Sequence, residues 1–241
     1  MATIAIYSLK GGVGKTTLAV NLAWCSATLS SRRTLLWDLD PQAASTFLLG
    51  ERGRGDAQAI FAGDVQPADL AQPTGIDRLD LIAADTSLRS LDILFHELDK
   101  KKRLAKLLGL LDRAYDHVLL DCPPGLTETS GQVMRAADLI VVPVIPSPLA
   151  SRAYAEIAEH LGRMRAQVPL MPVHSMVDRR RRLHCDALAR ESGWPVIPMA
   201  SIVETMSVRR AALGSFAARN PATKAFAALW QAIEMRLARG A

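Results

Sequence analysis

Short apolar runs alternate with longer amphipathic stretches along most of the chain. Runs rich in aliphatic and β-branched residues predict buried strands, and they cover residues 3–9, 34–37, 79–84, 117–120, 139–145, 172–177 and 195–198. Apolar residues at helical spacing predict helices over residues 18–27, 92–111, 150–166, 184–191 and 222–239. We expect a mixed helical region at 201–220, and surface loops around a short helix at 57–62 within residues 51–78.

This alternation of strands and helices indicates an α/β fold, with a mostly parallel twisted sheet and helices on both faces. The 241 residues are enough for one large domain with a sizeable core. The sequence contains no internal repeat, low-complexity tract or clear domain boundary. We therefore expect residues 1–241 to form a single domain.

A glycine-rich stretch, Lys10-Gly11-Gly12-Val13-Gly14-Lys15-Thr16-Thr17, lies between the first predicted strand and the first predicted helix. Glycines allow backbone N–H groups to approach phosphate oxygens, and the helix N-terminus adds partial positive charge. Lys15 can reach the outer phosphates of a nucleotide, and Thr16 can ligate Mg²⁺. The usual pattern G-x-x-x-x-G-K-[ST] is incomplete, because Leu9 stands at its first glycine position. The stretch predicts a phosphate-binding loop; the alternative is a glycine-rich turn with incidental lysines.

Acidic motifs follow two other predicted strands. Asp38-Leu39-Asp40-Pro41-Gln42 ends the second strand, and Asp121-Cys122-Pro123-Pro124-Gly125 ends the fourth. In open α/β sheets, ligands bind at the carboxyl ends of the strands. We expect Asp121 to hold Mg²⁺ through a water molecule, and the loop after it to sense a γ-phosphate. For Asp38 and Asp40 the alternative is a strand-ending turn with solvated acids.

The charge balance points to a second partner. The formal net charge is +5 and the pI is about 9.4, which suits nucleic acid or an anionic membrane surface. No apolar run approaches the length of a membrane span, and the chain enters its first strand without a signal peptide. Three widely spaced cysteines suggest neither a disulfide framework nor a metal site. A cytoplasmic location is expected.

In order and spacing, the glycine-rich stretch and the two acidic motifs resemble the nucleotide-site motifs of the ParA/MinD superfamily of deviant Walker ATPases. The motifs span about the first 60% of the chain, and their combination is more specific than any one of them. The Asp-Pro-Gln form of the second motif is more similar to the ParA branch than to the MinD branch. The resemblance implies a P-loop NTPase fold, and ATP and Mg²⁺ as cofactors.

The resemblance also implies an ATP-dependent homodimer that encloses two nucleotides. Lys10 would contact the phosphates bound by the partner subunit, whereas Lys15 would bind phosphates within its own subunit. Asp40 would orient or activate the attacking water, Asp38 would lie near the metal shell, and Asp121 would be the acid of the second Walker motif. The catalytic residues are thus expected to be Lys10, Lys15 and Asp40. Metal contacts are expected from Thr16, Asp38 and Asp121.

In the ParA branch, the ATP-bound dimer binds DNA without sequence preference, and a ParB-like or cargo adaptor protein stimulates hydrolysis. The resemblance therefore implies a positioning ATPase that partitions a plasmid, a chromosome region or a protein assembly, and that is nucleoid-associated when ATP is bound. The candidate DNA contacts are Arg179, Arg180, Arg181, Arg182, Arg209, Arg210 and Arg219. A solvated arginine cluster is the alternative.

Two other functions are compatible with parts of the sequence. A MinD-like membrane ATPase would use an amphipathic C-terminal helix, and Phe226 and Trp230 in the helix at 222–239 would suit an interface. We favour core packing for that helix, and therefore no membrane contact. A metabolic P-loop enzyme or an iron–sulfur relative is the third possibility. In every case, contacts to the adenine base are expected near the last two strands, at Asp178 and Pro198.

Overall fold

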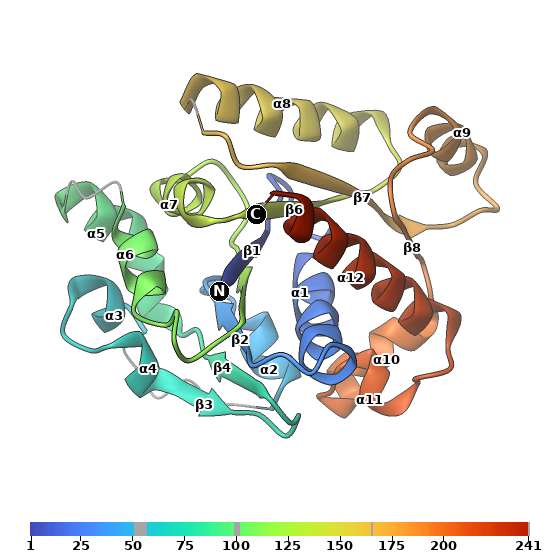
Figure 1. The fold of residues 1–241 in the computed structure, drawn as a ribbon. Helices are drawn as coiled ribbons and strands as arrows, with labels where there is room; N and C mark the ends of the chain where they lie inside the picture. Colours follow the sequence, from blue (N-terminus) through green and yellow to red (C-terminus); the bar gives the residue numbers. More distant parts are fainter. Residues whose placement is uncertain (51–56, 99–101, 165, 241) are drawn as a thin grey trace.

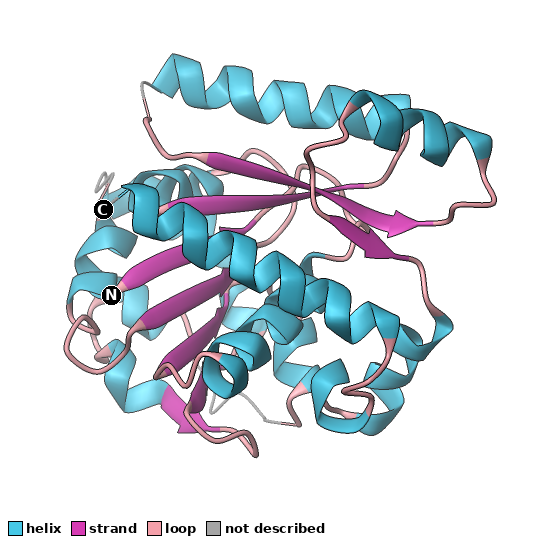
Figure 2. Cartoon of the chain, turned by 45° about the vertical axis from the view of Figure 1, so that its right-hand side comes forward, coloured by secondary structure: helices cyan, strands magenta, loops and turns pink. Residues whose placement is uncertain are grey.

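The computed structural model describes residues 1–50, 57–98, 102–164 and 166–240. Within these ranges, eight strands form one sheet in the order β3-β4-β2-β5-β1-β6-β7-β8 (Figures 1 and 2). All neighbouring strands are parallel except β3 and β4. The strands are β1 (Ala2–Ile6), β2 (Thr34–Asp38), β3 (Ala71–Pro73), β4 (Leu79–Ile82), β5 (His117–Asp121), β6 (Leu139–Val144), β7 (Leu170–Val177) and β8 (Val196–Pro198).

Helices cover both faces of the sheet, as the sequence predicts, and Figure 2 shows the two long helices α8 and α12 on opposite sides of it. One face is covered by α1 (Lys15–Trp24), its π-helical extension η1 (Cys25–Leu29), α2 (Ala44–Leu48), α10 (Ser201–Arg209), α11 (Leu213–Phe216) and α12 (Pro221–Gly240). The other is covered by α3 (Ala59–Ala62), α5 (Leu91–Leu98), α6 (Arg103–Gly109), α7 (Glu128–Ala136) and α8 (Pro148–Met164). The connections also contain α4 (Pro67–Leu70), η2 (Thr86–Ser90) and α9 (Arg182–Arg190).

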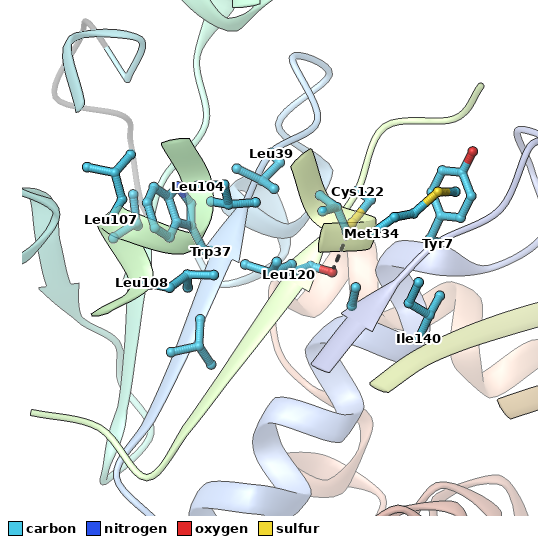
Figure 3. Close-up of a cluster of buried hydrophobic side chains, with 14 of the residues drawn as sticks. Tyr7, Trp37, Leu39, Leu104, Leu107, Leu108, Leu120, Cys122, Met134 and Ile140 are labelled. Carbon is cyan, nitrogen blue, oxygen red and sulfur yellow. Dashed lines mark hydrogen bonds between the residues drawn. The ribbon is translucent and has the colours of Figure 1, made fainter. Parts of the chain in front are cut away.

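The strands in the middle of the sheet are apolar on both sides because each side packs under helices. In β1, Ala5 faces one core cluster and Ile4 and Ile6 face the other. Figure 3 shows part of the first cluster, in which Trp37 lies among leucines of α6. Trp37 also stacks on Phe61, with ring centroids 5.6 Å apart. Both faces therefore hold the central strands rigidly, and with them the loops at their carboxyl ends.

Several elements differ from the sequence-based expectation. Residues 67–73 were expected to be loop but form α4 and the antiparallel edge strand β3, which is too short to show a periodic pattern. The predicted helix at 92–111 corresponds to two helices, α5 and α6, and residues 99–101 between them lie outside the described residues. Helices α2 and α7 were not predicted. The predicted loop residues 51–56 also lie outside the described residues.

Candidate nucleotide site

The glycine-rich loop runs from the end of β1 to the start of α1. Gly12 and Gly14 adopt positive φ angles of 72° and 89°, which side chains other than glycine rarely tolerate. A Cβ atom on Gly14 would also lie 3.2 Å from Ser175 Oγ. That hydroxyl donates a hydrogen bond of 2.8 Å to the Val13 carbonyl oxygen, so β7 supports the loop from below. The loop leads into the N-terminus of α1, where free N–H groups can bind an anion.

A cavity of about 430 Å³ lies over this loop. Lys15 is 7% exposed and lines this cavity. The cavity volume is within the usual range of small-ligand sites. Its lining combines the loop with both acidic motifs and consists of Gly11, Gly12, Gly14, Lys15, Thr16, Thr17, Asp40, Gln42, Pro124 and Met176. The structure therefore brings together three segments that are far apart in the sequence.

Two buried carboxylates lie beside the loop because β2 and β5 are adjacent. Their parallel register pairs Asp38 with Asp121, and both side chains are fully buried. Asp38 accepts hydrogen bonds at both oxygens, from the Thr46 backbone N–H and hydroxyl at Oδ2 and from the Asp40 N–H at Oδ1. Asp121 Oδ2 accepts a 2.7 Å bond from the Ser45 hydroxyl, whereas Asp121 Oδ1 has no hydrogen-bond partner.

Burial raises the pKa of both carboxyl groups, and for Asp38 the nearby Asp121 carboxylate adds to the increase. Hydrogen bonds to Asp38 act in the opposite direction, as do Ser45, Thr16 and Lys15 for Asp121. A bound cation would relieve the remaining electrostatic cost.

The residues around Asp121 fit Mg²⁺. The unpaired Asp121 oxygen is a buried hard donor, and the Thr16 hydroxyl lies near enough to favour the charged carboxylate. Since Asp38 already accepts bonds at both oxygens, Asp121 is the better placed of the two to reach a metal-bound water. The described residues contain no cluster of three His, Cys, Asp or Glu side chains suited to a metal. Mg²⁺ in phosphate sites needs no such cluster, because phosphates and water complete its shell.

Three residues of the site, Ser45, Thr46 and Ser175, were not predicted from the sequence. The first two belong to α2, which follows the Asp38-to-Gln42 motif after Ala43 in a left-handed conformation (φ 53°). Thr46 Oγ1 also accepts a bond from the Ala84 N–H, so it links Asp38 to the end of the neighbouring strand β4. Hydroxyls close behind an acidic motif were the available signal in the sequence. Their bonds to the carboxylates depend on strand register, which the sequence does not reveal.

Asp40 and Lys10 have freer side chains than the buried pair. Asp40 lines the cavity, and its Oδ1 accepts a bond from the Gln42 N–H. Lys10 donates its backbone N–H to Ser8 Oγ at 3.3 Å, and within the described residues it forms no ion pair. Lys10 does not line the cavity over the loop.

A second, smaller cavity of about 110 Å³ adjoins the first and shares Gly14, Thr17 and Met176 with it. Pro198, which the sequence predicts near the adenine base, lines this cavity together with the apolar residues Ile197, Met199 and Phe226. Asp178 does not line it; its carboxylate instead accepts two 2.9 Å bonds from the Arg180 guanidinium. Met176 has a positive φ of 55° where β7 and β8 change register, a conformation that sequence patterns do not indicate.

The candidate DNA-binding arginines form separate groups. Arg179 to Arg181 lie between β7 and α9, Arg182 is the first residue of α9, and Figures 1 and 2 show α9 beside α8 and away from α10. At the end of α10, the guanidinium of Arg209 lies 5.0 Å from the Phe216 ring centroid and that of Arg210 lies 4.4 Å from the Phe47 centroid. Among the seven candidates, only Arg180 forms an ion pair within the described part of the chain.

The apolar side of α12 is part of the core. Phe226 and Trp230 are each 1% exposed, and the Trp230 indole N–H donates to Ser30 Oγ at 2.8 Å. This confirms the expected core packing of that helix. None of the helices in the described ranges has the length and apolar character required to cross a bilayer.

A parallel sheet with a glycine loop at the start of α1 and acids at the ends of β2 and β5 defines a P-loop NTPase. Residues 1–170 match the family AAA_31, described as an AAA domain. The chain is 31% identical over 194 residues to the chromosome partitioning protein ParA of Caulobacter vibrioides, covering 76% of this chain and 72% of that protein. It therefore belongs to the ParA/MinD superfamily, whose members are ATPases, as the resemblance indicates.

A second relative is Soj, the sporulation initiation inhibitor protein of Bacillus subtilis. It is 36% identical over 145 residues, which span 58% of this chain and 57% of Soj. Among solved structures, the ATP complex of a McdA variant from Cyanothece has a TM-score of 0.84 at 22% identity, covering 97% of this chain and 96% of that one. MinD of Pyrococcus horikoshii, in complex with Mg-ADP, has a TM-score of 0.83 at 20% identity and covers 100% and 98%. These structural likenesses confirm the predicted fold class.

Proposed function

We propose that this chain is a ParA-like positioning ATPase, with residues 1–241 acting as one domain. Binding of ATP and Mg²⁺ drives formation of a homodimer, and the dimer binds DNA without sequence preference. The observation that carries this proposal is that Asp40 lines the cavity over the glycine loop, while the buried Asp38 and Asp121 lie paired at the ends of the adjacent strands β2 and β5. A loop alone would bind phosphate, whereas the added carboxylates supply what Mg²⁺-dependent hydrolysis requires.

Each residue of the nucleotide site has its own role in ATP hydrolysis. The N–H groups of Gly11 to Thr17 and the Lys15 ammonium hold the phosphates, and Thr16 and Asp121 hold Mg²⁺, with Asp121 acting through water. When bound, Mg²⁺ neutralises charge that develops on the phosphate oxygens. Asp40 orients the attacking water, and its place on the cavity wall supports this role. Pro198 and its apolar neighbours in the smaller cavity contact the adenine base.

Lys10 makes hydrolysis depend on a second subunit. It lies at the mouth of the loop without an ion pair in the described residues, so its ammonium is available to phosphates held by the partner subunit. A lysine supplied in this way adds positive charge where the transition state needs it. Because the γ-phosphate contacts both subunits, ATP favours the dimer and ADP does not.

The DNA surface comprises the candidate arginines that are exposed and free of acidic partners. In a dimer each contact occurs twice, so affinity should fall steeply with salt. We propose that a ParB-like or cargo adaptor stimulates hydrolysis and that the protein is cytoplasmic, with nucleoid association in the ATP state. The similarity to the chromosome partitioning protein ParA of Caulobacter vibrioides supports partitioning as the cellular function.

The test measures binding of random-sequence DNA and of anionic phospholipid vesicles, each with ADP and with a slowly hydrolysed ATP analogue. We expect DNA binding with the analogue, weaker binding with ADP, and no vesicle binding in either state. Vesicle binding with the analogue would establish the MinD-like alternative, against which the burial of Phe226 and Trp230 argues. Nucleotide turnover that requires a small-molecule acceptor and no DNA would establish a metabolic P-loop enzyme.

A further inference from the structure

Residues 207–212, here called the arginine turn, carry Arg209 and Arg210 from the end of α10 towards α11. Arg210 is the C-cap of α10, in a left-handed conformation with φ 47°, and its N–H donates to the Met206 carbonyl oxygen. A left-handed residue at this position is a common way for a helix to end. Helix α2 contacts the arginine turn, and α1 contacts the residues on either side of it.

The first contact comes from α2. The guanidinium carbon of Arg210 lies 4.4 Å from the centroid of the Phe47 ring. Phe47 directly follows Ser45 and Thr46, whose hydroxyls donate to Asp121 at 2.7 Å and to Asp38 at 2.8 Å. Three consecutive residues of a five-residue helix therefore contact both buried carboxylates and the arginine turn.

The second contact comes from α1, which begins at Lys15 and Thr16. Asn21 is 1% exposed, and its amide group donates to the Thr17 carbonyl oxygen at 2.8 Å and to Met206 Sδ at 3.3 Å. Its Oδ1 accepts the Leu213 N–H at 2.8 Å. Met206 and Leu213 flank the arginine turn, so Asn21 fixes both of its ends to the helix that starts at the phosphate loop.

We propose that α2 couples the nucleotide state to DNA binding, with Phe47 as the positioning residue for Arg210. A cation beside Asp121 changes the charge that the Ser45 hydroxyl faces, and because Ser45 and Thr46 both tie the short helix α2 to the buried carboxylates, the hydrogen bonds that position α2 change with it. Because Phe47 moves with that helix, the orientation of Arg210 follows the nucleotide, while Asn21 keeps the ends of the turn in place. This inference rests on the proposed binding of DNA by Arg209 and Arg210.

The chain offers a matched control. Arg209 is the neighbour of Arg210 and also lies on an aromatic ring, that of Phe216 at 5.0 Å. Phe216 belongs to α11, which contributes none of the hydrogen bonds to Asp38 or Asp121. The two Phe–Arg pairs thus differ in their connection to the buried carboxylates, and also in burial, because Phe216 packs partly against the core. Because Phe47 is 46% exposed, its replacement should leave the core intact.

The experiment compares Phe47→Ala, Phe47→Trp and Phe216→Ala with the unmodified protein. DNA affinity is measured at fixed salt with a slowly hydrolysed ATP analogue and with ADP. Phe47→Ala should weaken binding with the analogue about two- to fivefold, the size of an exposed cation–π contact, and leave binding with ADP nearly unchanged. Phe216→Ala should weaken both by a similar factor and preserve their ratio, and Phe47→Trp should restore the original ratio.

Hydrogen exchange provides a readout that does not need DNA. In the unmodified protein the analogue should slow amide exchange in residues 207–212 relative to ADP, and Phe47→Ala should remove this difference. An equal effect of Phe47→Ala on both nucleotide states, or a nucleotide difference in exchange that survives it, would overturn the coupling. If the unmodified protein fails to bind DNA, the proposed DNA function is wrong, and the exchange measurement still decides whether α2 controls the turn.

Discussion

Replacing Asn21 with Leu should destabilise the protein substantially, although the two side chains are similar in size. The change removes the acceptor of the Leu213 N–H and the donor to the Thr17 carbonyl. A buried N–H left without a partner costs about 1–3 kcal/mol, and the lost bond to Thr17 costs less because that carbonyl also lies in a helix. We therefore expect a loss of about 2–3 kcal/mol. For a chain of this size, that lowers Tm by about 4–12 °C.

The assay is thermal and urea unfolding of Asn21→Leu without nucleotide, with Ser207→Ala as the control. Ser207 is exposed, and its hydroxyl donates only within α10, to the Glu204 carbonyl, so its replacement should change stability by less than about 0.5 kcal/mol. Amide exchange should also rise selectively in residues 207–213. If the Tm of Asn21→Leu lies within about 2 °C of that of the unmodified protein, Asn21 does not anchor the ends of the arginine turn.

The remaining predictions concern the nucleotide and DNA sites. Asp40→Ala should slow hydrolysis by about 10²-fold or more while ATP still binds and the dimer forms, as measured by phosphate release and light scattering; failure to bind ATP would contradict the assigned role. Lys10→Ala should weaken ATP-dependent dimerisation, and an unchanged dimer by light scattering counts against the contact between subunits. Replacing Arg179 to Arg182 with Ala should lower DNA affinity and flatten its salt dependence; an unchanged slope assigns the contacts to Arg209, Arg210 and Arg219. Burial raises the pKa of Asp38 in the folded state, so the protonated carboxyl group stabilises the folded protein. This stabilisation is complete below about pH 3.9, the ordinary pKa of Asp, and is lost as the pH rises through the pKa of the folded state. Asp38→Asn should therefore flatten the decline in Tm with pH of the nucleotide-free protein, and parallel curves would contradict the raised pKa.

Local sequence patterns were sufficient for the parts of the site that lie within one strand–loop–helix unit. The glycine loop could be predicted because its spacing, the apolar run before it and the helix after it are all contiguous. Asp38 and Asp121 could be predicted to lie together because parallel strands share a carboxyl edge, although they are 83 positions apart by residue number. Their shared edge follows once both strands lie in the same sheet, whereas the direct pairing of β2 with β5 is seen in the structure.

Other features depend on contacts that no local pattern encodes. Ser175 supports Val13 across a separation of 162 residues, and Ser45 reaches Asp121 across 76. Both contacts require the register of particular strands and the position of a short helix. The arginines show the same limit, because the sequence grouped Arg209 and Arg210 by charge alone. Their different aromatic partners, Phe216 and Phe47, become visible only when α10, α11 and α2 are placed in space.

The buried carboxylate pair explains why the site can act as a switch. Asp38 and Asp121 lie opposite each other at 0% exposure, and the Lys15 ammonium offsets only part of their charge. Desolvation and repulsion make the nucleotide-free arrangement costly, so a cation that binds beside Asp121 recovers free energy that phosphate contacts alone would not supply. Ser45 donates to Oδ2 of Asp121 and Thr46 donates to Oδ2 of Asp38, so a change in the charge on the pair acts directly on the hydrogen bonds of α2. A ligand can shift a conformational equilibrium only by its differential affinity for the two states, and this pair provides such a difference between a site with Mg²⁺ and one without it.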